Sequence, residues 1–151
     1  MAGTDPTVHA SAVLVGAKAA LIRGPSGSGK SRLAWDLVSA ATEGLLPFAR
    51  LIADDRAHLE TCSGRLLVRP AQALAGILEI YGLGIRQIEF EPVGMVGLVV
   101  DLGAADAARS PTVRAGTTKI EGVSLPRLAV AAGMMPLPLV LAALHIPPRG
   151  N

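Results

Sequence analysis

A glycine-rich run that ends in a lysine and a serine constrains this chain more than any other feature. Residues 24–31, GPSGSGKS, match G-x-x-x-x-G-K-[ST], a pattern whose backbone N–H groups surround phosphate oxygens. The apolar residues 19–22 before it indicate a buried strand, and apolar residues recur at helical spacing after it. The sequence therefore predicts a strand, a phosphate-binding loop and a helix, with the nucleotide held by Gly24, Pro25, Ser26, Gly27, Ser28, Gly29, Lys30 and Ser31.

Two residues of this loop carry specific chemistry. Lys30 is expected to reach the β- and γ-phosphates, and the Ser31 hydroxyl is expected to bind Mg²⁺. A chance glycine-rich turn before a helix is the alternative, but such a turn has no need of a lysine and a serine at fixed offsets. ATP and Mg²⁺ are accordingly the expected cofactors.

Composition narrows the class of protein. The 151 residues fit one domain, residues 1–151, and a hydrophobic content of 50% provides for a substantial core. A net charge of +2 and four aromatic residues argue against nucleic-acid binding. No signal peptide is recognised at the N-terminus, and breakers interrupt the longest uncharged stretch, so no membrane span is expected. The single Cys62 excludes an internal disulfide and favours a reducing, cytoplasmic location.

Hydrophobic patterning predicts an α/β domain with a mixed sheet that is formed largely by meanders. A tight turn at Gly16-Ala17 is expected to join the first two strands as an antiparallel pair. Strands are predicted near residues 12–16, 19–23, 48–53, 57–61, 65–69, 85–90 and 95–101, and helices at 29 to about 42 and about 136–144.

Two adjacent carboxylates, Asp54 and Asp55, follow the apolar strand in the run FARLIADDRAHLE. Neighbouring side chains on a strand point to opposite faces, so the two carboxylates can serve different tasks. We expect Asp54 to lie near Mg²⁺ and Asp55 to take the proton from an attacking hydroxyl group. The alternative is a solvated Asp-Asp turn, which the glycine loop upstream makes less attractive.

A glutamate stands among apolar residues in the run ILEIYGLGIRQIEF. Charge at Glu79 is costly unless a cation or a donor compensates it. Gly82 and Gly84 allow the backbone to bend or to approach another group closely. Local physics leaves two readings open, a metal ligand or a surface glutamate on a glycine-broken loop.

The chain resembles the catalytic domain of the bacterial HPr kinase/phosphorylase family, which phosphorylates a serine of the phosphocarrier protein HPr. The resemblance rests on VHASAVLVG, GPSGSGKS, LIADDRAHLE, LEIYGLGI and GVSLPRLAV, and it covers most of residues 8–130. Leu-Glu-Ile-x-Gly-Leu-Gly-Ile is specific to the family, although Tyr81 replaces its usual arginine. Family members generally have an additional N-terminal domain, which this sequence lacks, as in a shortened form from some proteobacteria.

The resemblance implies a P-loop core similar to that of phosphoenolpyruvate carboxykinase, and it implies roles for individual residues. Asp55 matches the catalytic aspartate, and Glu79 matches a second magnesium ligand. His9 matches an active-site histidine, and Arg109 aligns loosely with an arginine of a mobile catalytic loop; without the family, both read as surface residues. The resemblance also implies HPr as partner and a homo-oligomer, specifically a hexamer.

The same resemblance bears on a reverse reaction. In longer members a lysine- and arginine-containing segment is associated with phosphorolysis, in which inorganic phosphate attacks phosphoserine and releases pyrophosphate. Here the strand VSLPRLAV runs into Ala131-Ala132-Gly133-Met134-Met135, so those cations are missing and only Arg127 lies nearby. We expect weak phosphorolysis unless Arg127 or Arg114 replaces them.

The expected function is thus an ATP- and Mg²⁺-dependent protein-serine kinase that acts on HPr and regulates carbohydrate metabolism. Two alternatives remain at this point. A small-molecule kinase would use the same glycine loop without a protein partner, and a nucleotide-sensing module would bind ATP without transferring phosphate.

Overall fold

The computed structural model describes residues 6–147 and residue 149. The elements within this range, in chain order, are β1 (Ala10–Val15), β2 (Lys18–Arg23), α1 (Lys30–Thr42), β3 (Ala49–Ala53), β4 (Ala57–Cys62), β5 (Arg65–Pro70), the 3₁₀ turn η1 (Gln72–Leu74), β6 (Ile77–Ile80), β7 (Gly84–Gln87), β8 (Gly94–Leu102), β9 (Thr117–Ile120), β10 (Val123–Val130) and α2 (Pro136–His145). The expected domain limits, residues 1 and 151, lie outside the described residues.

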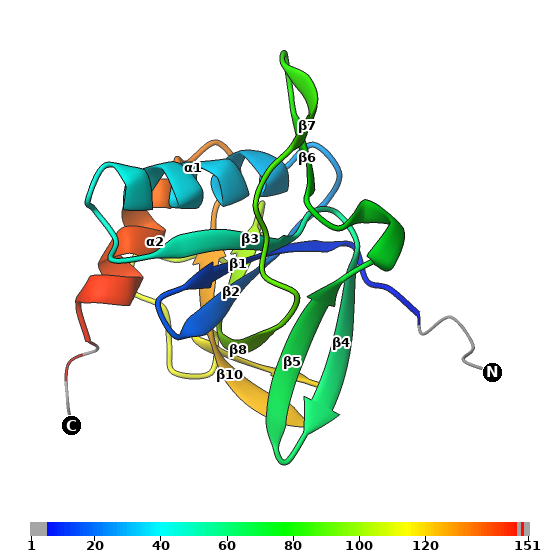
Figure 1. The fold of residues 1–151 in the computed structure, drawn as a ribbon. Helices are drawn as coiled ribbons and strands as arrows, with labels where there is room; N and C mark the ends of the chain where they lie inside the picture. The colour runs from blue at the N-terminus through cyan, green and yellow to red at the C-terminus, as the bar shows by residue number, and fades with distance from the viewer. Residues whose placement is uncertain (1–5, 148, 150–151) are drawn as a thin grey trace.

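A mixed sheet forms the centre of the molecule, as the sequence predicts (Figure 1). Its strand order is β3-β1-β2-β8-β10-β9, and β5 attaches the β4–β5 hairpin to β8. β8 runs parallel to both β2 and β10, whereas β1 is antiparallel to β2 and β3. The turn at Gly16-Ala17 joins β1 to β2, and the φ of Gly16, 62°, is one that glycine adopts without strain.

These strand directions bring four segments to one edge of the sheet. Because β1 is antiparallel to both β2 and β3, these two neighbours run in the same direction. β8 and β10 run in that direction too. The chain therefore leaves β2, β3, β8 and β10 at a common edge. Ligands of open α/β sheets bind at the carboxyl ends of such strands.

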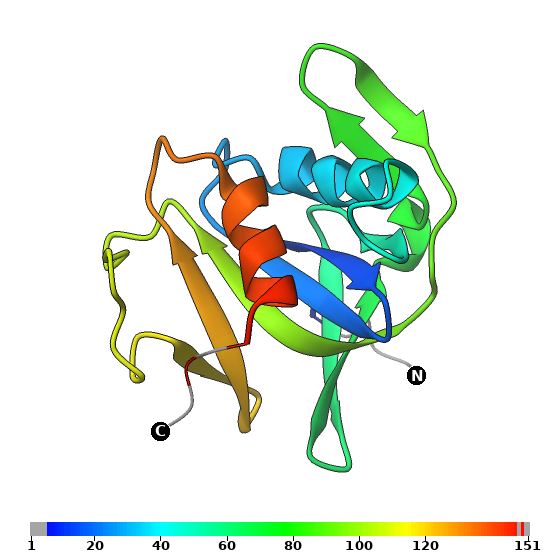
Figure 2. The same cartoon turned by 90° about the vertical axis from the view of Figure 1, so that its left-hand side faces the viewer.

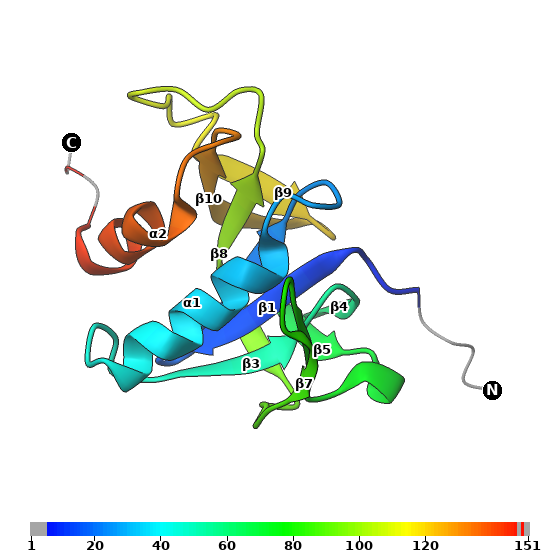
Figure 3. The same cartoon turned by 90° about the horizontal axis from the view of Figure 1, so that it is seen from above.

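Alternation along the strands divides the core into two layers. Val13, Ile22 and Val100 lie in the layer shared with the helices, whereas their neighbours Ala12, Leu21 and Val99 lie on the opposite face. α1 packs over β1 and β3, as Figure 3 shows from above. Its buried apolar positions include Leu33, Ala34 and Leu37, which the helical pattern predicts. Each large side chain of this kind contributes about 1.5–3 kcal/mol when fully buried.

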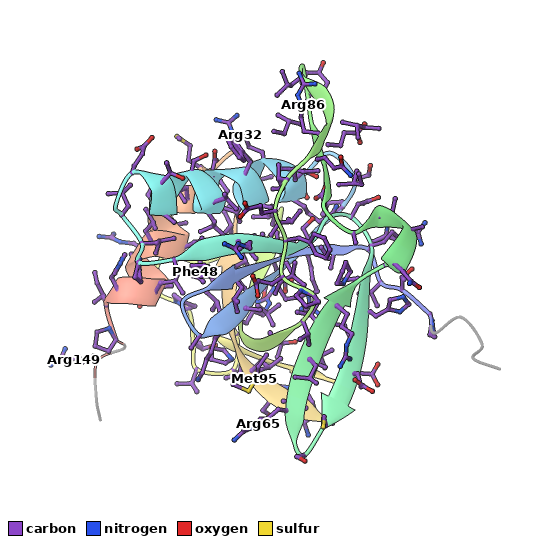
Figure 4. The ribbon with its side chains drawn as sticks, viewed as in Figure 1. Arg32, Phe48, Arg65, Arg86, Met95 and Arg149 are labelled. Atoms are coloured by element: carbon purple, nitrogen blue, oxygen red, sulfur yellow. The ribbon has the colours of Figure 1, made fainter. Side chains whose placement is uncertain are left out.

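The hairpin β6–β7 was predicted only in its second strand, because the patterning gave no strand at β6. It forms a separate two-stranded sheet and projects from the body of the molecule (Figures 1 and 2). The strand predicted at 85–90 covers only Gly84–Gln87, because residues 88–91 turn back and bond to the body through Ile88 N–H on Gly76 O and Glu91 N–H on Leu51 O, both 2.8 Å. Figure 4 shows Arg86 near the outer end of this hairpin. Strand β9 was also not predicted.

Within the described residues, neither helix has the length and apolar character needed to cross a bilayer.

Candidate active site

The glycine loop joins β2 to α1 at the common sheet edge. At Gly24 the loop passes close to its surroundings, since a Cβ there would lie 2.5 Å from Ser28 Oγ and 3.0 Å from Leu102 O. Gly29 caps α1 with a φ of 100°, a conformation that strains any other residue. The backbone thus adopts a curve that only glycines permit at these points, and the start of α1 opens onto it.

The Lys30 side chain folds back over this loop. Its ammonium donates to Gly24 O at 3.0 Å and to Pro25 O at 3.3 Å, and the residue is only 8% exposed. Phosphate oxygens are stronger partners for an ammonium group than carbonyl oxygens are. The Lys30 ammonium group is therefore held inside the loop, where phosphate oxygens can replace the two carbonyl oxygens as its hydrogen-bond acceptors.

Asp54 is the hydrogen-bonding centre behind the loop. It is 7% exposed, and its carboxylate accepts the Ser31 hydroxyl at 2.6 Å and the Ser11 hydroxyl at 2.8 Å. The backbone N–H of Glu79 on β6 is a third donor to the same carboxylate, at 3.2 Å. Because the Ser31 hydroxyl donates its only proton to Asp54, the hydrogen bond fixes the orientation of the hydroxyl group. The lone pairs of its oxygen then point away from Asp54 and can ligate a cation.

Asp55 lies two residues beyond the end of β3, next to Asp54. Its φ of 69° places this non-glycine residue in the left-handed region, which costs about 1–3 kcal/mol. The side chain is 61% exposed, and one carboxylate oxygen lies 3.8 Å from His9 Nδ1. Asp54 is thus buried behind the loop, whereas Asp55 is exposed beside His9, and the roles expected of the two carboxylates stay predictions.

Ser11 holds these two aspartates in place, and the sequence analysis did not select it. This fully buried residue of β1 donates to Asp54 and accepts the Asp55 backbone N–H at 3.1 Å. The signal was a hydroxyl at a core-facing position of an apolar strand, where a buried polar group requires a partner. Nothing in one sequence identifies that partner.

Glu79 lies on β6 with an exposed side chain, while its backbone reaches Asp54. Among the residues that the structure describes, no group of three or more His, Cys, Asp or Glu side chains is arranged to hold a metal ion. Ser31 and Asp54 nevertheless fit Mg²⁺, which prefers oxygen ligands and keeps several waters. Glu79 is near this pair through its backbone, and its role as a ligand stays a prediction.

Arg109 is exposed and belongs to the segment between β8 and β9, and its role at the site stays a prediction. An ion-pair network secures this segment at its base. Arg127 Nε donates to Asp101 at 2.6 Å, and its two terminal nitrogens donate to Asp106 at 2.8 and 2.9 Å. Arg23, the residue before the loop, donates to both carboxylate oxygens of Asp101, at 2.7 and 2.9 Å.

The network changes the acidity of its members. Burial alone would raise the pKa of Asp101, but hydrogen bonds from Arg23 and Arg127 outweigh it and hold that pKa below its ordinary value of 3.8. The hydrogen bond from Arg127 lowers the pKa of Asp106 in the same way. Arg127 in turn has its pKa raised by the hydrogen bonds to Asp106 and Asp101. The positive charge of Arg127 is therefore balanced by the carboxylates of Asp101 and Asp106.

Fold and site together define a P-loop domain built for phosphate transfer, with a buried carboxylate behind the serine of the loop. The chain matches the family model of the HPr serine kinase C-terminal domain over residues 3–131 and belongs to this family of protein-serine kinases. This finding confirms the resemblance drawn from the sequence motifs.

A solved structure supports the fold independently. The chain is similar to the Hpr(Ser) kinase/phosphatase from Coxiella burnetii, with a TM-score of 0.71, 22% sequence identity and coverage of 93% of each chain. A comparison with curated proteins finds no significant match.

Proposed function

We propose that this protein uses ATP and Mg²⁺ to phosphorylate a serine of the phosphocarrier HPr. The observation that carries the proposal is the pairing behind the glycine loop, where the buried Asp54 accepts the Ser31 hydroxyl while the adjacent Asp55 stays exposed. A site that only bound a nucleotide would need the first carboxylate but not the second. Membership of the HPr serine kinase family supports the acceptor.

The residues divide the reaction among themselves. Lys30 exchanges its carbonyl contacts for phosphate oxygens and offsets their charge. Asp54 orients the Ser31 hydroxyl. These two residues would hold Mg²⁺, which would supply further positive charge beside the phosphates. The acceptor serine oxygen forms a bond to the γ-phosphorus as the bond to the departing ADP oxygen breaks, and Asp55 takes the serine proton. His9, 3.8 Å from Asp55, lies where it can orient that carboxylate.

Three finer properties belong to the same proposal. Glu79 contributes a second oxygen ligand from β6, and Arg109 reaches the site from the segment between β8 and β9. The protein acts in the cytoplasm, consistent with its free and exposed Cys62. There it regulates carbohydrate metabolism. It assembles as a homo-oligomer, a hexamer by resemblance, which light scattering on the purified protein tests directly.

The decisive experiment incubates the purified protein with γ-labelled ATP, Mg²⁺ and HPr from the same cell. Phosphoserine on HPr is the expected product, and HPr with its acceptor serine replaced by alanine should stay unlabelled. Label on a small molecule without HPr would identify a small-molecule kinase instead. Tight ATP binding without any transfer would identify a nucleotide sensor.

A further inference from the structure

Residues 103–116, which connect β8 to β9, begin against the glycine loop. Because β10 lies between β8 and β9 in the sheet, this connection, which we name the crossing segment, passes from one side of β10 to the other. At its start, a Cβ added at Gly103 would lie 3.6 Å from the Pro25 ring, and one added at Gly24 would lie 3.0 Å from Leu102 O. Figures 2 and 3 show the segment leaving the end of β8 at the sheet edge where the glycine loop lies. A displacement of the crossing segment would therefore disturb its contact with the phosphate-binding loop.

Arg127 on β10 holds both ends of the crossing segment. Its terminal nitrogens donate to the two carboxylate oxygens of Asp106, near the start of the segment, at 2.8 and 2.9 Å. One of these nitrogens also donates to Ala115 O, near the end of the segment, at 3.0 Å. The Arg127 backbone N–H donates to Gly116 O at 2.8 Å. The two ends are thus fixed to a single residue of the strand that the segment crosses.

The same side chain is linked to the glycine loop through a shared carboxylate. Arg127 Nε donates to Asp101 on β8, and Arg23 at the end of β2 donates to the same carboxylate. Arg23 directly precedes Gly24, the first residue of the loop. A continuous set of contacts accordingly runs from the loop across β2, β8 and β10 to both ends of the crossing segment.

The contacts of Arg127 require the shape of a guanidinium group and not only its charge. Its four side-chain hydrogen bonds use four of the five N–H donors that the fixed fork of an arginine presents. A lysine would keep the positive charge, but it could not bind Asp106 bidentately while it contacts Asp101 and Ala115 O. The Arg127 side chain is only 14% exposed, so water competes little for these donors.

We propose that Arg127 is a positioning residue for phosphate transfer, a clamp that holds the crossing segment in place beside the glycine loop so that the acceptor serine meets the γ-phosphate. The inference rests on the proposed kinase function. Arg127 acts through Asp106, Asp101 and the backbone of the segment, and not on the reacting atoms. Loss of the clamp should therefore slow transfer more than it weakens nucleotide binding, because Lys30 and the loop backbone hold the phosphates whereas transfer also depends on the alignment of the acceptor.

The test uses two variants that weaken the clamp in different ways. Arg127→Lys keeps the charge and removes the fork, and Asp106→Asn removes only the carboxylate near the start of the segment. The Asp106 side chain is 55% exposed, so its variant keeps the β8–β10 pairing intact if Arg127→Lys folds poorly. Arg69→Lys, which changes the partner of Glu60 on the β4–β5 hairpin, is the matched control. Each protein is assayed for its ATP affinity and for phosphate transfer to HPr.

Trypsin provides a second measurement that does not depend on activity. Arg109 and Arg114 lie inside the crossing segment and are exposed, so trypsin can cleave after either residue once the segment opens locally. Mass spectrometry of the fragments identifies these two cleavages. We expect cleavage within the segment to be at least about 5-fold faster in Arg127→Lys and in Asp106→Asn than in the wild-type protein and in Arg69→Lys.

We expect Arg127→Lys to lower kcat for HPr phosphorylation about 10-fold while the Kd for ATP changes less than about 3-fold. The double variant with Asp106→Asn should be no more than about 2-fold slower than Arg127→Lys alone, because both changes break one interaction. Fully additive losses would exclude Asp106 as the residue through which Arg127 acts.

Wild-type kcat in both folded variants, or unchanged cleavage within the segment, would overturn the clamp and leave the kinase function standing. An equal loss of ATP affinity and of rate would place the effect of Arg127 on nucleotide binding and would contradict a positioning role in transfer. Failure of the wild-type protein to phosphorylate HPr would overturn the proposed function together with this inference.

Discussion

Ser11 on β1 and Asp54, the residue after β3, are joined by a hydrogen bond of 2.8 Å between the serine hydroxyl and one carboxylate oxygen, although 43 positions separate them in the sequence. The same hydroxyl accepts the backbone N–H of Asp55 at 3.1 Å. One buried side chain therefore fixes the carboxylate behind the glycine loop and the backbone of the proposed base. The relative placement of the two aspartates depends on it.

Replacing Ser11 by alanine should lower kinase turnover by about 10-fold and destabilise the fold by about 1–3 kcal/mol, because a buried carboxylate and a backbone N–H each lose a partner. Steady-state kinetics and urea unfolding measure the two effects. Ser124→Ala, at an exposed position of β10, is the control and should alter neither. Full turnover in a folded Ser11→Ala protein would show that Ser31 and Glu79 N–H suffice to hold Asp54.

Asp55→Asn should reduce turnover about 100-fold or more and leave ATP affinity within a few-fold. The amide keeps the shape of the side chain but cannot accept the serine proton. Single-turnover transfer and equilibrium ATP binding separate the two quantities. Asp36→Asn, on α1, removes a carboxylate that pairs with Arg32 and should retain activity. Unchanged turnover in Asp55→Asn would remove Asp55 as the base.

Lys30→Ala should weaken both ATP binding and phosphate transfer, since the ammonium serves the bound nucleotide and the transition state alike. The expected loss in kcat/KM is about 100-fold or more. Tripolyphosphate affinity should fall as well, because the lost contact is to phosphate. Lys119→Ala, on the exposed side of β9, controls for a loss of net charge. If ATP affinity and rate both survive, the glycine loop is not the phosphate site.

The Asp101 network should make stability depend on acid. The folded-state pKa of Asp101 lies below its ordinary value of 3.8, so the ionised form is favoured by folding. Its contribution is complete above about pH 4 and is lost as the pH falls through the folded-state pKa. Urea unfolding between pH 6 and pH 2 should show this decline, and Asp101→Asn should flatten it. An equally steep decline in the variant would assign the acid sensitivity to other carboxylates.

Phosphorolysis should be weak relative to the kinase reaction. The sequence left open that Arg127 replaces the missing cations, but its nitrogens are bonded to Asp101, Asp106 and Ala115 O. An attacking phosphate dianion consequently cannot rely on Arg127, whose charge is already paired with two carboxylates. Pyrophosphate release from phosphoserine-HPr at millimolar phosphate, compared with the forward rate, measures it. Robust release that survives Arg127→Ala and Arg114→Ala would show that these cations are not required.

The sequence by itself determined the elements whose signals are local. The spacing of glycines, Lys30 and Ser31 predicted the strand, loop and helix, because steric freedom and helix periodicity act over a few residues. The helix expected from residue 29 to about 42 is observed at Lys30–Thr42. The family motif identified the chain for a similar reason, since it is read from consecutive residues.

Only the tertiary structure decided which distant groups meet. Ser11 on β1, Ser31 on α1 and Glu79 on β6 all meet Asp54, which follows β3. The antiparallel direction of β1 places the start of that strand, and so Ser11, beside the end of β3. Strand β6 was not predicted because three apolar residues around a glutamate carry too little periodicity to separate a strand from a loop. The network around Arg127 was equally hidden, because pairing between charges depends on which strands are neighbours and not on their spacing along the chain.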